Sequence, residues 1–208
     1  MTLYLARHGE TTWNLEGRLQ GQRFGGELTA LGSSQAEDLA ALAPTLGLTR
    51  LYSSPLDRAL TTALLVSRAT GLPATVHEAL AEVDFGDASG LTLAEVEARW
   101  PGFTARREAD RWRTPWPGGE SYEALVARAR RFLDAIRLKP EGATLIVAHQ
   151  TMNRAMLVAL GAATFEAVLA SRQPSHLLLI IEGHAVQHRM VGPEGTPAQA
   201  GLWRAELL

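Results

Sequence analysis

The chain has 208 residues, of which 46% are hydrophobic and 20% charged, as in globular proteins and unlike disordered ones. Its 20 lysine and arginine residues oppose 22 aspartates and glutamates, and the formal net charge of -2 gives no reason to expect nucleic acid or an anionic membrane as partner. Cysteine is absent, which excludes disulfides and thiolate metal sites, and no apolar run approaches the ~20 residues of a membrane span. We therefore expect a cytoplasmic protein without a signal peptide, folded as a single domain over 1–208.

Short apolar runs alternate with amphipathic stretches along the chain. In chain order the pattern predicts a strand at 2–7, a helix at 29–43, a strand at 50–53, a helix at 55–71, a short helix between Thr92 and Pro101, a helix at 121–138, a strand at 143–149 that leads into another helix, and a hairpin of strands at 176–182 and 185–191. The segment 101–119 is rich in Arg, Trp, Pro and Gly, and we expect it to be a surface excursion near the active site. The alternation predicts an α/β fold: a three-layer αβα sandwich with a mostly parallel central sheet and an antiparallel edge strand.

Two of these helices begin at residues with the spacing of a capping box. Ser54 is followed three positions later by Asp57, and Thr92 by Glu95. Pro55 also suits the first position of a helix. The sequence therefore predicts helix starts at both places.

Arginine and histidine side chains follow three of the predicted strands at the point where each strand ends. Arg7 and His8 close the first strand, Arg58 lies one turn into the helix after the second, and His149 closes the third. The carboxyl ends of parallel strands meet at one edge of a sheet, where α/β proteins bind ligands. Guanidinium groups bind phosphoryl oxygens in a bidentate way, and a neutral histidine can attack phosphorus to form a covalent intermediate. Together the four residues indicate phosphoryl transfer.

Such a reaction also needs a proton donor for the leaving oxygen, placed beside the pocket. Glu82, in the stretch EVDFGDASG, is the leading candidate. Glu10, Asp84 and Asp87 are the acidic residues that could replace it.

A longer series of motifs accompanies these residues. In order they are Arg7-His8-Gly9-Glu10-Thr11, Trp13-Asn14, Gln20-Gly21, Leu28-Thr29, Ser53-Ser54-Pro55-Leu56 with Arg58-Ala59, Glu82, Phe85-Gly86, Pro117-Gly118-Gly119-Glu120-Ser121 and Val147-Ala148-His149. This order, over roughly residues 1 to 160, resembles the signature of the histidine phosphatase superfamily, also called the phosphoglycerate mutase-like family, and of its phosphatase branch.

The resemblance implies a metal-independent phosphomonoester phosphatase that needs no cofactor and acts on a small phosphorylated metabolite. His8 would be the nucleophile that becomes phosphohistidine, while Arg7, Arg58 and His149 would bind and neutralise the phosphoryl group. Glu82 would protonate the leaving alkoxide and then deprotonate the attacking water.

The resemblance also extends to residues around the proposed pocket. Three of them match family positions and are expected to contact phosphate or substrate: Asn14, Gln20 and Gly21. Two segments depart from the family pattern. After His149 the family often has a glycine-rich continuation, whereas this chain has Gln150-Thr151. The bulkier residues would narrow the pocket, or Thr151 would offer its hydroxyl to phosphate. Residues 23–27 replace an aspartate–proline turn. Both departures concern the choice of substrate rather than the chemistry.

Three other functions remain open. The first is a phosphoglycerate mutase on the same site, and the second is a non-catalytic module that binds a phospholigand. Retention of His8, His149 and Glu82 argues against the binding module, since binding needs only the arginines. A metal-dependent hydrolase using His8, His149 and Asp84 is a weaker option.

The choice between phosphatase and mutase depends on a second anion site. A mutase needs such a site to hold its bisphosphorylated intermediate, and the short tail after the hairpin has few cationic residues to supply one. Four arginines of the excursion could supply the second anion site: Arg106, Arg107, Arg111 and Arg113. Such runs of arginine are more often solvated helix faces.

The expected partner is a small phosphorylated substrate. We expect no nucleic acid or membrane partner, and a homodimer is possible.

Overall fold

The computed structural model describes residues 2–23, 25–137, 142–193 and 195–203. Within these residues seven strands form one mixed sheet in the order β3-β2-β4-β1-β5-β6-β7. Their bounds are β1 Thr2–Arg7, β2 Leu48–Ser53, β3 Ala74–Val76, β4 Ala143–Ala148, β5 Leu177–Glu182, β6 Ala185–Met190 and β7 Gln199–Ala200. The strands β3, β2, β4 and β1 pair in parallel, whereas β5, β6 and β7 extend the sheet by antiparallel pairing.

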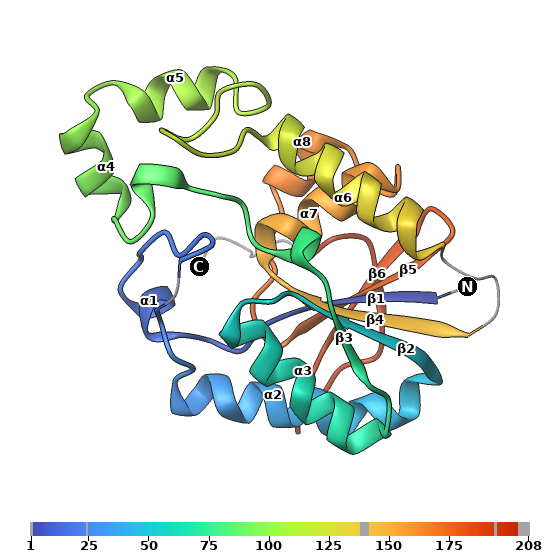
Figure 1. Ribbon diagram of the computed structural model, residues 1–208. Helices are drawn as coiled ribbons and strands as arrows, with labels where there is room; N and C mark the ends of the chain where they lie inside the picture. Colours follow the sequence, from blue (N-terminus) through green and yellow to red (C-terminus); the bar gives the residue numbers. More distant parts are fainter. Residues whose placement is uncertain (1, 24, 138–141, 194, 204–208) are drawn as a thin grey trace.

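Helices cover both faces of this sheet. Their bounds are α1 Thr12–Leu15, α2 Ala30–Leu42, α3 Asp57–Thr70, α4 Leu93–Arg99, α5 Phe103–Ala109, α6 Tyr122–Ile136, α7 Gln150–Ala159 and α8 Phe165–Leu169. In Figure 1, α2 and α3 lie below the sheet, and α6, α7 and α8 lie above it. The predicted three-layer α/β architecture is therefore confirmed.

The alternation of side chains along β1 explains why two helical layers are needed. Leu3 and Leu5 belong to the core that includes α6 and α7, whereas Ala6 belongs to the core that includes α2 and α3. The neighbouring strand β4 is buried along its whole length. Strands that are covered on both faces read as continuous apolar runs, which is the pattern that identified them in the sequence.

The sheet differs from the prediction in its antiparallel half. The hairpin forms, with Gly183 in its turn at φ 60°, but β5 pairs with β1 and so lies inside the sheet instead of at its edge. Half of the strand pairings are consequently antiparallel, and the outer strand on this side is β7. The strands β3 and β7, of three and two residues, are too short to leave a pattern in the sequence.

The predicted helices appear as α2, α3, α4, α6 and α7. Residue 138, the predicted end of α6, lies outside the described residues. The capping box of Thr92 and Glu95 is present at the start of α4. The segment 101–119, which we expect to be a surface excursion, contains α5 and buries the side chains of Phe103 and Trp116.

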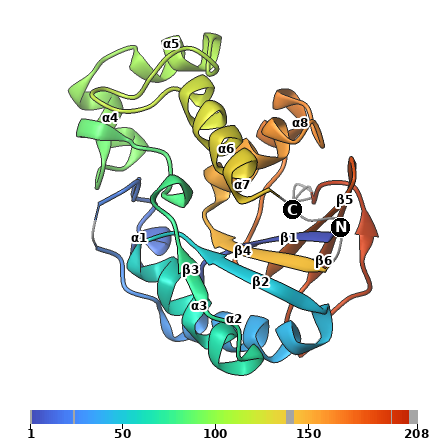
Figure 2. The ribbon, with the colours of Figure 1, turned by 45° about the vertical axis from the view of Figure 1, so that its right-hand side comes forward.

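The parallel strands carry the candidate site at their carboxyl ends. In Figure 1 the chain enters β1 at the right and leaves it at the left, where α1 lies below α4 and α5. In Figure 2, α4 and α5 lie beside the upper end of α6, on the side of the molecule away from α2 and α3. No helix among the described residues is both long enough and apolar enough to span a membrane.

Candidate active site

His8 is the first residue after β1, and its side chain is buried. Its Nδ1 lies 2.7 Å from the backbone oxygen of Gly9. Because a carbonyl oxygen can only accept, Nδ1 carries the proton of the neutral ring and Nε2 keeps its lone pair. Nε2 makes no hydrogen bond with the residues that the structure describes, so its lone pair is free to attack an electrophile.

Two glycines let the loop after β1 pass close to α2. A Cβ on Gly9 would lie 2.1 Å from the backbone oxygen of Gly32, and a Cβ on Gly32 would lie 2.0 Å from that of Glu10. The backbone N–H of Gly9 donates to Thr62 Oγ1 at 3.3 Å, and that of Glu10 donates to Gln35 Oε1 at 2.9 Å. This close packing explains the glycine of the Arg-His-Gly motif and holds the carbonyl that orients His8.

His149 follows β4 and lies beside His8, with ring centroids 5.1 Å apart. Its Nε2 is 2.7 Å from Ser54 Oγ, and its Nδ1 is buried without a partner among the described residues. Because the N–H of Leu56 already donates to Ser54 Oγ, the serine hydroxyl can donate its proton to His149 Nε2. That arrangement leaves Nδ1 as an N–H donor for a bound anion.

The predicted capping role of Ser54 is therefore wrong. α3 begins at Asp57 with Leu56 as its N-cap and no side-chain cap. Ser54 instead uses its hydroxyl on His149, which is 95 residues away in the chain. A capping box is a local pattern and cannot report a partner at that distance.

Two arginines complete the cluster. Arg58, which is 5% exposed, donates from Nη2 to the backbone oxygen of Gly21 at 2.7 Å. Arg7 donates from Nη1 to the backbone oxygen of Gln173 at 3.3 Å. The Nε atoms of both arginines are buried without a protein partner among the described residues. Each guanidinium is thus held on one side and keeps further donors for a ligand.

The electrostatics of the cluster favour neutral histidines beside charged arginines. Burial and the charges of Arg7 and Arg58 hold the pKa of His8 well below its usual value. Burial, Arg58, His8 and Arg7 do the same to the pKa of His149. Burial lowers the pKa of Arg58 to about 10, so this side chain stays protonated at pH 7. An anion that enters the cluster meets two cations and two imidazoles.

Glu82 reaches this cluster from the loop after β3, and it is 9% exposed. Its Oε1 accepts from the backbone N–H groups of Val83 at 2.9 Å and Met152 at 3.1 Å, and its Oε2 accepts from that of Thr151 at 3.3 Å. The carboxyl group therefore sits at the N-terminus of α7, directly after His149. Its charge also acts on the guanidinium groups of Arg7 and Arg58, which places it near the cluster, and its role as proton donor stays a prediction.

Arg128 of α6 fixes the loop that carries Glu82. Its guanidinium donates to the backbone oxygens of Ala79 at 2.9 Å, Ala81 at 2.7 Å and Glu82 at 3.1 Å. It also forms an ion pair with Glu120, with 2.8 Å between Nη2 and Oε2. Three hydrogen bonds from this one side chain hold the loop against α6, and Glu120 holds the guanidinium in place.

Asn14 and Gln20, which are expected to contact substrate, form hydrogen bonds with Thr11 through their side-chain amides. Asn14 Oδ1 accepts from the backbone N–H and the hydroxyl of Thr11, both at 3.1 Å, and Gln20 Nε2 donates to Thr11 Oγ1 at 2.7 Å. Gly21 presents its carbonyl to Arg58, and Thr151 holds Glu82 through its backbone. These residues border the cluster, and their contact with substrate stays a prediction.

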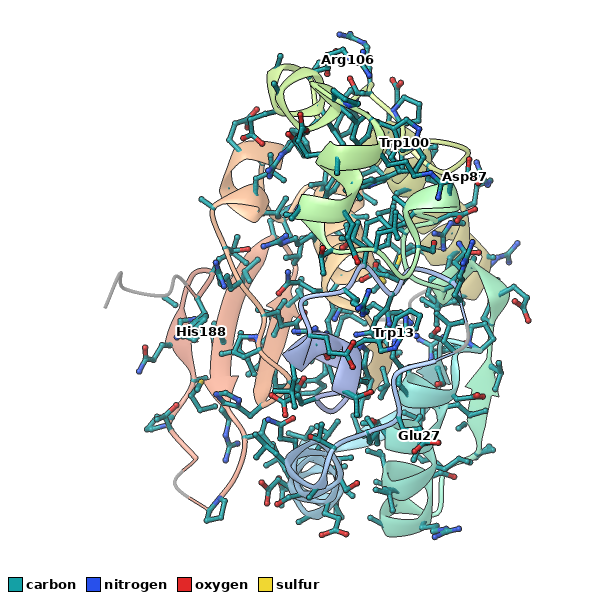
Figure 3. All side chains as sticks on the ribbon, turned by 90° about the vertical axis from the view of Figure 1, so that its left-hand side faces the viewer. Trp13, Glu27, Asp87, Trp100, Arg106 and His188 are labelled. Carbon is teal, nitrogen blue, oxygen red and sulfur yellow. The ribbon has the colours of Figure 1, made fainter. Side chains whose placement is uncertain are left out.

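The segment 23–27, which departs from the family pattern, packs on Trp13. A Cβ would come within 2.8 Å of the tryptophan ring at Gly25 and within 3.1 Å of the Trp13 side chain at Gly26. Residue 24 lies outside the described residues. Figure 3 looks from the left-hand side of Figure 1 and places Trp13 near the middle of the view. The two glycines therefore make room for this ring.

The four arginines of the excursion separate into two pairs. Arg106 and Arg113 are exposed, and Figure 3 shows Arg106 at the outer end of the molecule on α5. Arg107 and Arg111 are half-buried and line a cleft between α5, α6 and α7. The interpretation of the four arginines as a solvated helix face is therefore wrong for Arg107 and Arg111.

No cluster of three or more His, Cys, Asp or Glu side chains in the described parts of the chain is placed to hold a metal ion. Asp84, considered above as a possible ligand beside the histidines, accepts from the backbone N–H of Gly86 at 2.8 Å. The arginines and the imidazoles suit a phosphoryl group directly, whereas the backbone N–H groups of Thr151 and Met152 at the start of α7 donate to Glu82.

Two supporting residues left no signal in the sequence. Gln173, whose carbonyl holds Arg7, donates from Nε2 to the backbone oxygen of Leu5 at 2.9 Å. Asn153 donates from Nδ2 to Gln173 Oε1 at 2.8 Å and to the backbone oxygen of Ala6 at 3.1 Å. Neither residue belongs to a motif, and only the fold brings them together.

Comparison with known proteins identifies the family. The family model described as histidine phosphatase superfamily (branch 1) matches residues 3–192. A mycobacterial glucosyl-3-phosphoglycerate phosphatase has a similar structure, with a TM-score of 0.78 and 26% sequence identity over 99% of both chains.

Two curated relatives are similar in sequence. Phosphoserine phosphatase 1 of Hydrogenobacter thermophilus is 34% identical over 159 residues, which cover 76% of this chain and 75% of that protein. A bifunctional protein of Mycobacterium tuberculosis is 40% identical over 157 residues, which cover 74% of this chain. The match spans only 43% of the length of that second protein.

Proposed function

The chain belongs to the histidine phosphatase superfamily, branch 1, and we propose that it is a phosphomonoester phosphatase that transfers the phosphoryl group through His8. The observation that carries this proposal is the state of His8: a buried neutral ring with Nδ1 held by Gly9 and Nε2 free, beside Arg7 and Arg58. The similarity to proteins named as phosphoserine and glucosyl-3-phosphoglycerate phosphatases supports it.

In the first step Nε2 of His8 attacks phosphorus, and the bond from phosphorus to the leaving oxygen breaks. Arg7 and Arg58 bind the phosphoryl oxygens, and the Nδ1–H of His149 donates to one of them. Glu82 gives its proton to the leaving oxygen, so that an alcohol departs and a phosphohistidine remains. The guanidinium groups stabilise the charge on the oxygens in the transition state without moving.

In the second step water attacks the phosphohistidine. Glu82 takes a proton from this water, the hydroxyl adds to phosphorus, and the electron pair of the broken P–N bond returns to Nε2 of His8. Inorganic phosphate leaves, with Glu82 protonated and His8 neutral for the next turnover. The residues supply every charge and proton in this cycle, and we propose that it proceeds without a metal ion.

The test is a screen of small phosphomonoesters in the presence of EDTA, with inorganic phosphate as the readout. We expect phosphate release, an acid-labile adduct on His8 after rapid quenching, and loss of both in His8→Ala, with turnover lowered about 10⁴-fold or more. Substantial activity in the variant would contradict the assignment.

The same assay separates hydrolysis from mutase chemistry. 3-Phosphoglycerate with a trace of 2,3-bisphosphoglycerate should yield free phosphate. Rapid formation of 2-phosphoglycerate with little free phosphate would identify a mutase instead.

A further inference from the structure

The proposed proton donor, Glu82, lies on a loop without regular structure. Residues 81–85 form neither helix nor strand, and the single 3₁₀ turn before them covers only Glu78–Leu80. The backbone oxygens of such a loop need hydrogen-bond partners from elsewhere in the fold. A general acid must also lie within about 2.6–3.2 Å of the oxygen that it protonates, so this loop has to be held with little freedom.

Arg128 supplies the partners that the loop lacks. Its Nη1 donates to the backbone oxygens of Ala79 and Ala81, and its Nη2 donates to that of Glu82 itself. The other two N–H groups, on Nε and Nη2, donate to the two carboxylate oxygens of Glu120 at 2.9 and 2.8 Å. All five N–H donors of this guanidinium therefore have acceptors within the protein.

This saturation separates Arg128 from the arginines of the histidine cluster. Arg7 and Arg58 each keep an Nε without a protein partner among the described residues, and so retain donors for a ligand. Arg128 could bind a phosphoryl oxygen only by releasing the loop. A lysine at this position would have three donors and no planar fork, so it could not reach the same set of acceptors.

Glu120 holds the far side of the same loop. Its Oε2 also accepts from the backbone N–H of Asp84 at 2.9 Å, and its own backbone N–H donates to the oxygen of Asp84 at 2.8 Å. A Cβ on Gly119 would collide with that oxygen, so the turn that precedes Glu120 packs directly on the loop. The Pro-Gly-Gly-Glu motif thus brings one carboxylate to both Arg128 and Asp84.

The loop is also joined to the phosphoryl site. The backbone oxygen of Glu82 accepts from Gln22 Nε2 at 3.0 Å, in addition to Arg128. The residue before Gln22 is Gly21, whose carbonyl oxygen accepts from Arg58. Two neighbouring residues therefore connect the loop of the proton donor with an arginine of the histidine cluster.

We propose that Arg128 and Glu120 are positioning residues for proton transfer, which hold the carboxyl group of Glu82 at the leaving oxygen and contact neither the phosphoryl group nor the rest of the substrate. This inference rests on the proposed function, which assigns that proton to Glu82. In that step the O–H bond of Glu82 breaks, an O–H bond forms on the leaving oxygen, and the electron pair of the P–O bond departs with that oxygen. Loss of Arg128 would free the loop, and a misplacement of about 1 Å can cost roughly 100-fold in rate.

The experiment compares phenyl phosphate with p-nitrophenyl phosphate, which have the same charge and nearly the same size. Phenolate is a basic leaving group that gains from protonation, whereas p-nitrophenolate departs without a proton. The readout is the ratio of kcat/KM for phenyl phosphate to that for p-nitrophenyl phosphate. Arg128→Met should lower this ratio about tenfold or more, and Glu120→Gln about threefold. Arg128→Lys keeps the charge and part of the contacts, and should lower the ratio by an intermediate amount.

A double variant tests whether Arg128 acts through Glu82. Glu82→Gln alone should lower the ratio, and Arg128→Met added to it should lower the ratio no further, because the proton donor is already lost. Arg131→Met, at an exposed position one turn further along α6, is the matched control and should leave the ratio unchanged. Arg50→Met removes a hydrogen bond to the backbone oxygen of Ile136 at the end of α6, and should lower only the free energy of unfolding.

The outcomes separate this inference from the proposed function. If the wild-type protein releases phosphate from neither substrate, the proposed function fails. The positioning role is overturned, and the proposed function stands, if Arg128→Met and Arg128→Lys keep the wild-type ratio or lose activity equally on both substrates. A double variant with a ratio well below that of Glu82→Gln would overturn it as well.

An unchanged ratio in Glu82→Gln itself would remove Glu82 as proton donor and the positioning role with it, while His8 would remain the nucleophile. Urea unfolding shows which variants are folded. If Arg128→Met is not folded, Arg128→Lys decides the outcome by the same ratio.

Discussion

The two arginines of the histidine cluster, Arg7 and Arg58, and Arg107 of the cleft are held in different ways. Arg7 is the last residue of β1, Arg58 lies in the first turn of α3 after β2, and both donate to backbone carbonyl oxygens, at 3.3 and 2.7 Å. Arg107 lies on the seven-residue helix α5, makes no hydrogen bond through its guanidinium to the described residues, and is oriented by the ring of Trp116. The first pair is fixed by the backbone, and Arg107 by side-chain packing.

This difference matches a division of tasks. A phosphoryl group has the same geometry in every phosphomonoester, so a rigid backbone frame can bind it in all of them. The remainder of the substrate varies, and a segment packed by aromatic side chains can change without disturbing the sheet. We therefore expect changes in the histidine cluster to affect all substrates alike, and changes in the cleft to affect only some.

The largest effect among the following variants should come from Glu82→Gln. Removal of a general acid typically costs 10²–10⁴-fold in rate, and we expect that loss for alkyl phosphates of every kind. The loss should be smaller for p-nitrophenyl phosphate, because its leaving group departs without a proton. Steady-state kinetics on both classes of substrate measures the difference.

Asp87→Asn is the matched control, because this carboxylate is exposed on the same segment (Figure 3). It should retain wild-type kinetics. Equal losses on alkyl and p-nitrophenyl substrates in Glu82→Gln would instead show that another group donates the proton.

Ser54→Ala should produce the next largest effect. The hydroxyl holds Nε2 of His149, and without it the ring no longer has a fixed tautomer for the phosphoryl oxygen. The loss of one such buried contact corresponds to about 1–3 kcal/mol, or roughly 5- to 150-fold in kcat. The kinetic loss should be similar for every substrate, unlike that of a variant in the cleft.

Ser53→Ala distinguishes positioning from stability. Ser53 is equally buried, and its hydroxyl donates to the backbone oxygen of Ser54 at 2.9 Å. Both variants should lower the free energy of unfolding by a similar amount, about 1 kcal/mol, while only Ser54→Ala loses activity. Equal activity losses in the two variants would assign Ser54 a structural role.

The histidine cluster could be predicted from the sequence because its geometry follows from the sheet. Once the apolar runs ending at Arg7 and Ala148 are parallel strands, His8 and His149 must lie side by side, and the register confirms that these two strands pair. Arg58 follows by the same argument from β2. The α/β architecture was accessible for the same reason, since strands buried on both faces are continuous apolar runs.

The cleft could not be predicted, because neighbouring residues of one arginine run have different surroundings. Arg106 and Arg107 are indistinguishable in the sequence, and only the position of Trp116, nine residues further on, selects Arg107 for the interior. Tyr122, which also lines the cleft, reads as an ordinary first residue of α6. Such packing depends on contacts between distant segments, and no local pattern records it.

The last effect that we predict concerns the dependence of the free energy of unfolding on pH. The pKa of His8 and that of His149 are both held well below the usual 6.5, chiefly by burial. Below pH 6.5 the unfolded chain binds protons that the folded chain does not, so the free energy of unfolding should fall as pH falls from about 6.5. The limiting slope is about 1.4 kcal/mol per pH unit for each histidine. Urea unfolding between pH 5 and 7.5 measures it.

Three single variants tie that slope to the histidine cluster and not to the cleft. His8→Asn should remove about half of it, whereas His184→Asn, in the exposed turn between β5 and β6, should leave it unchanged. Arg107→Met should also leave it unchanged, because the pKa of Arg107, which burial lowers to about 10, keeps this residue protonated in both states throughout this range. If the free energy of unfolding of His8→Asn kept the full slope against pH, the cluster would not be what holds the His8 ring neutral. The free lone pair on Nε2, on which the nucleophilic role rests, would then be unexplained.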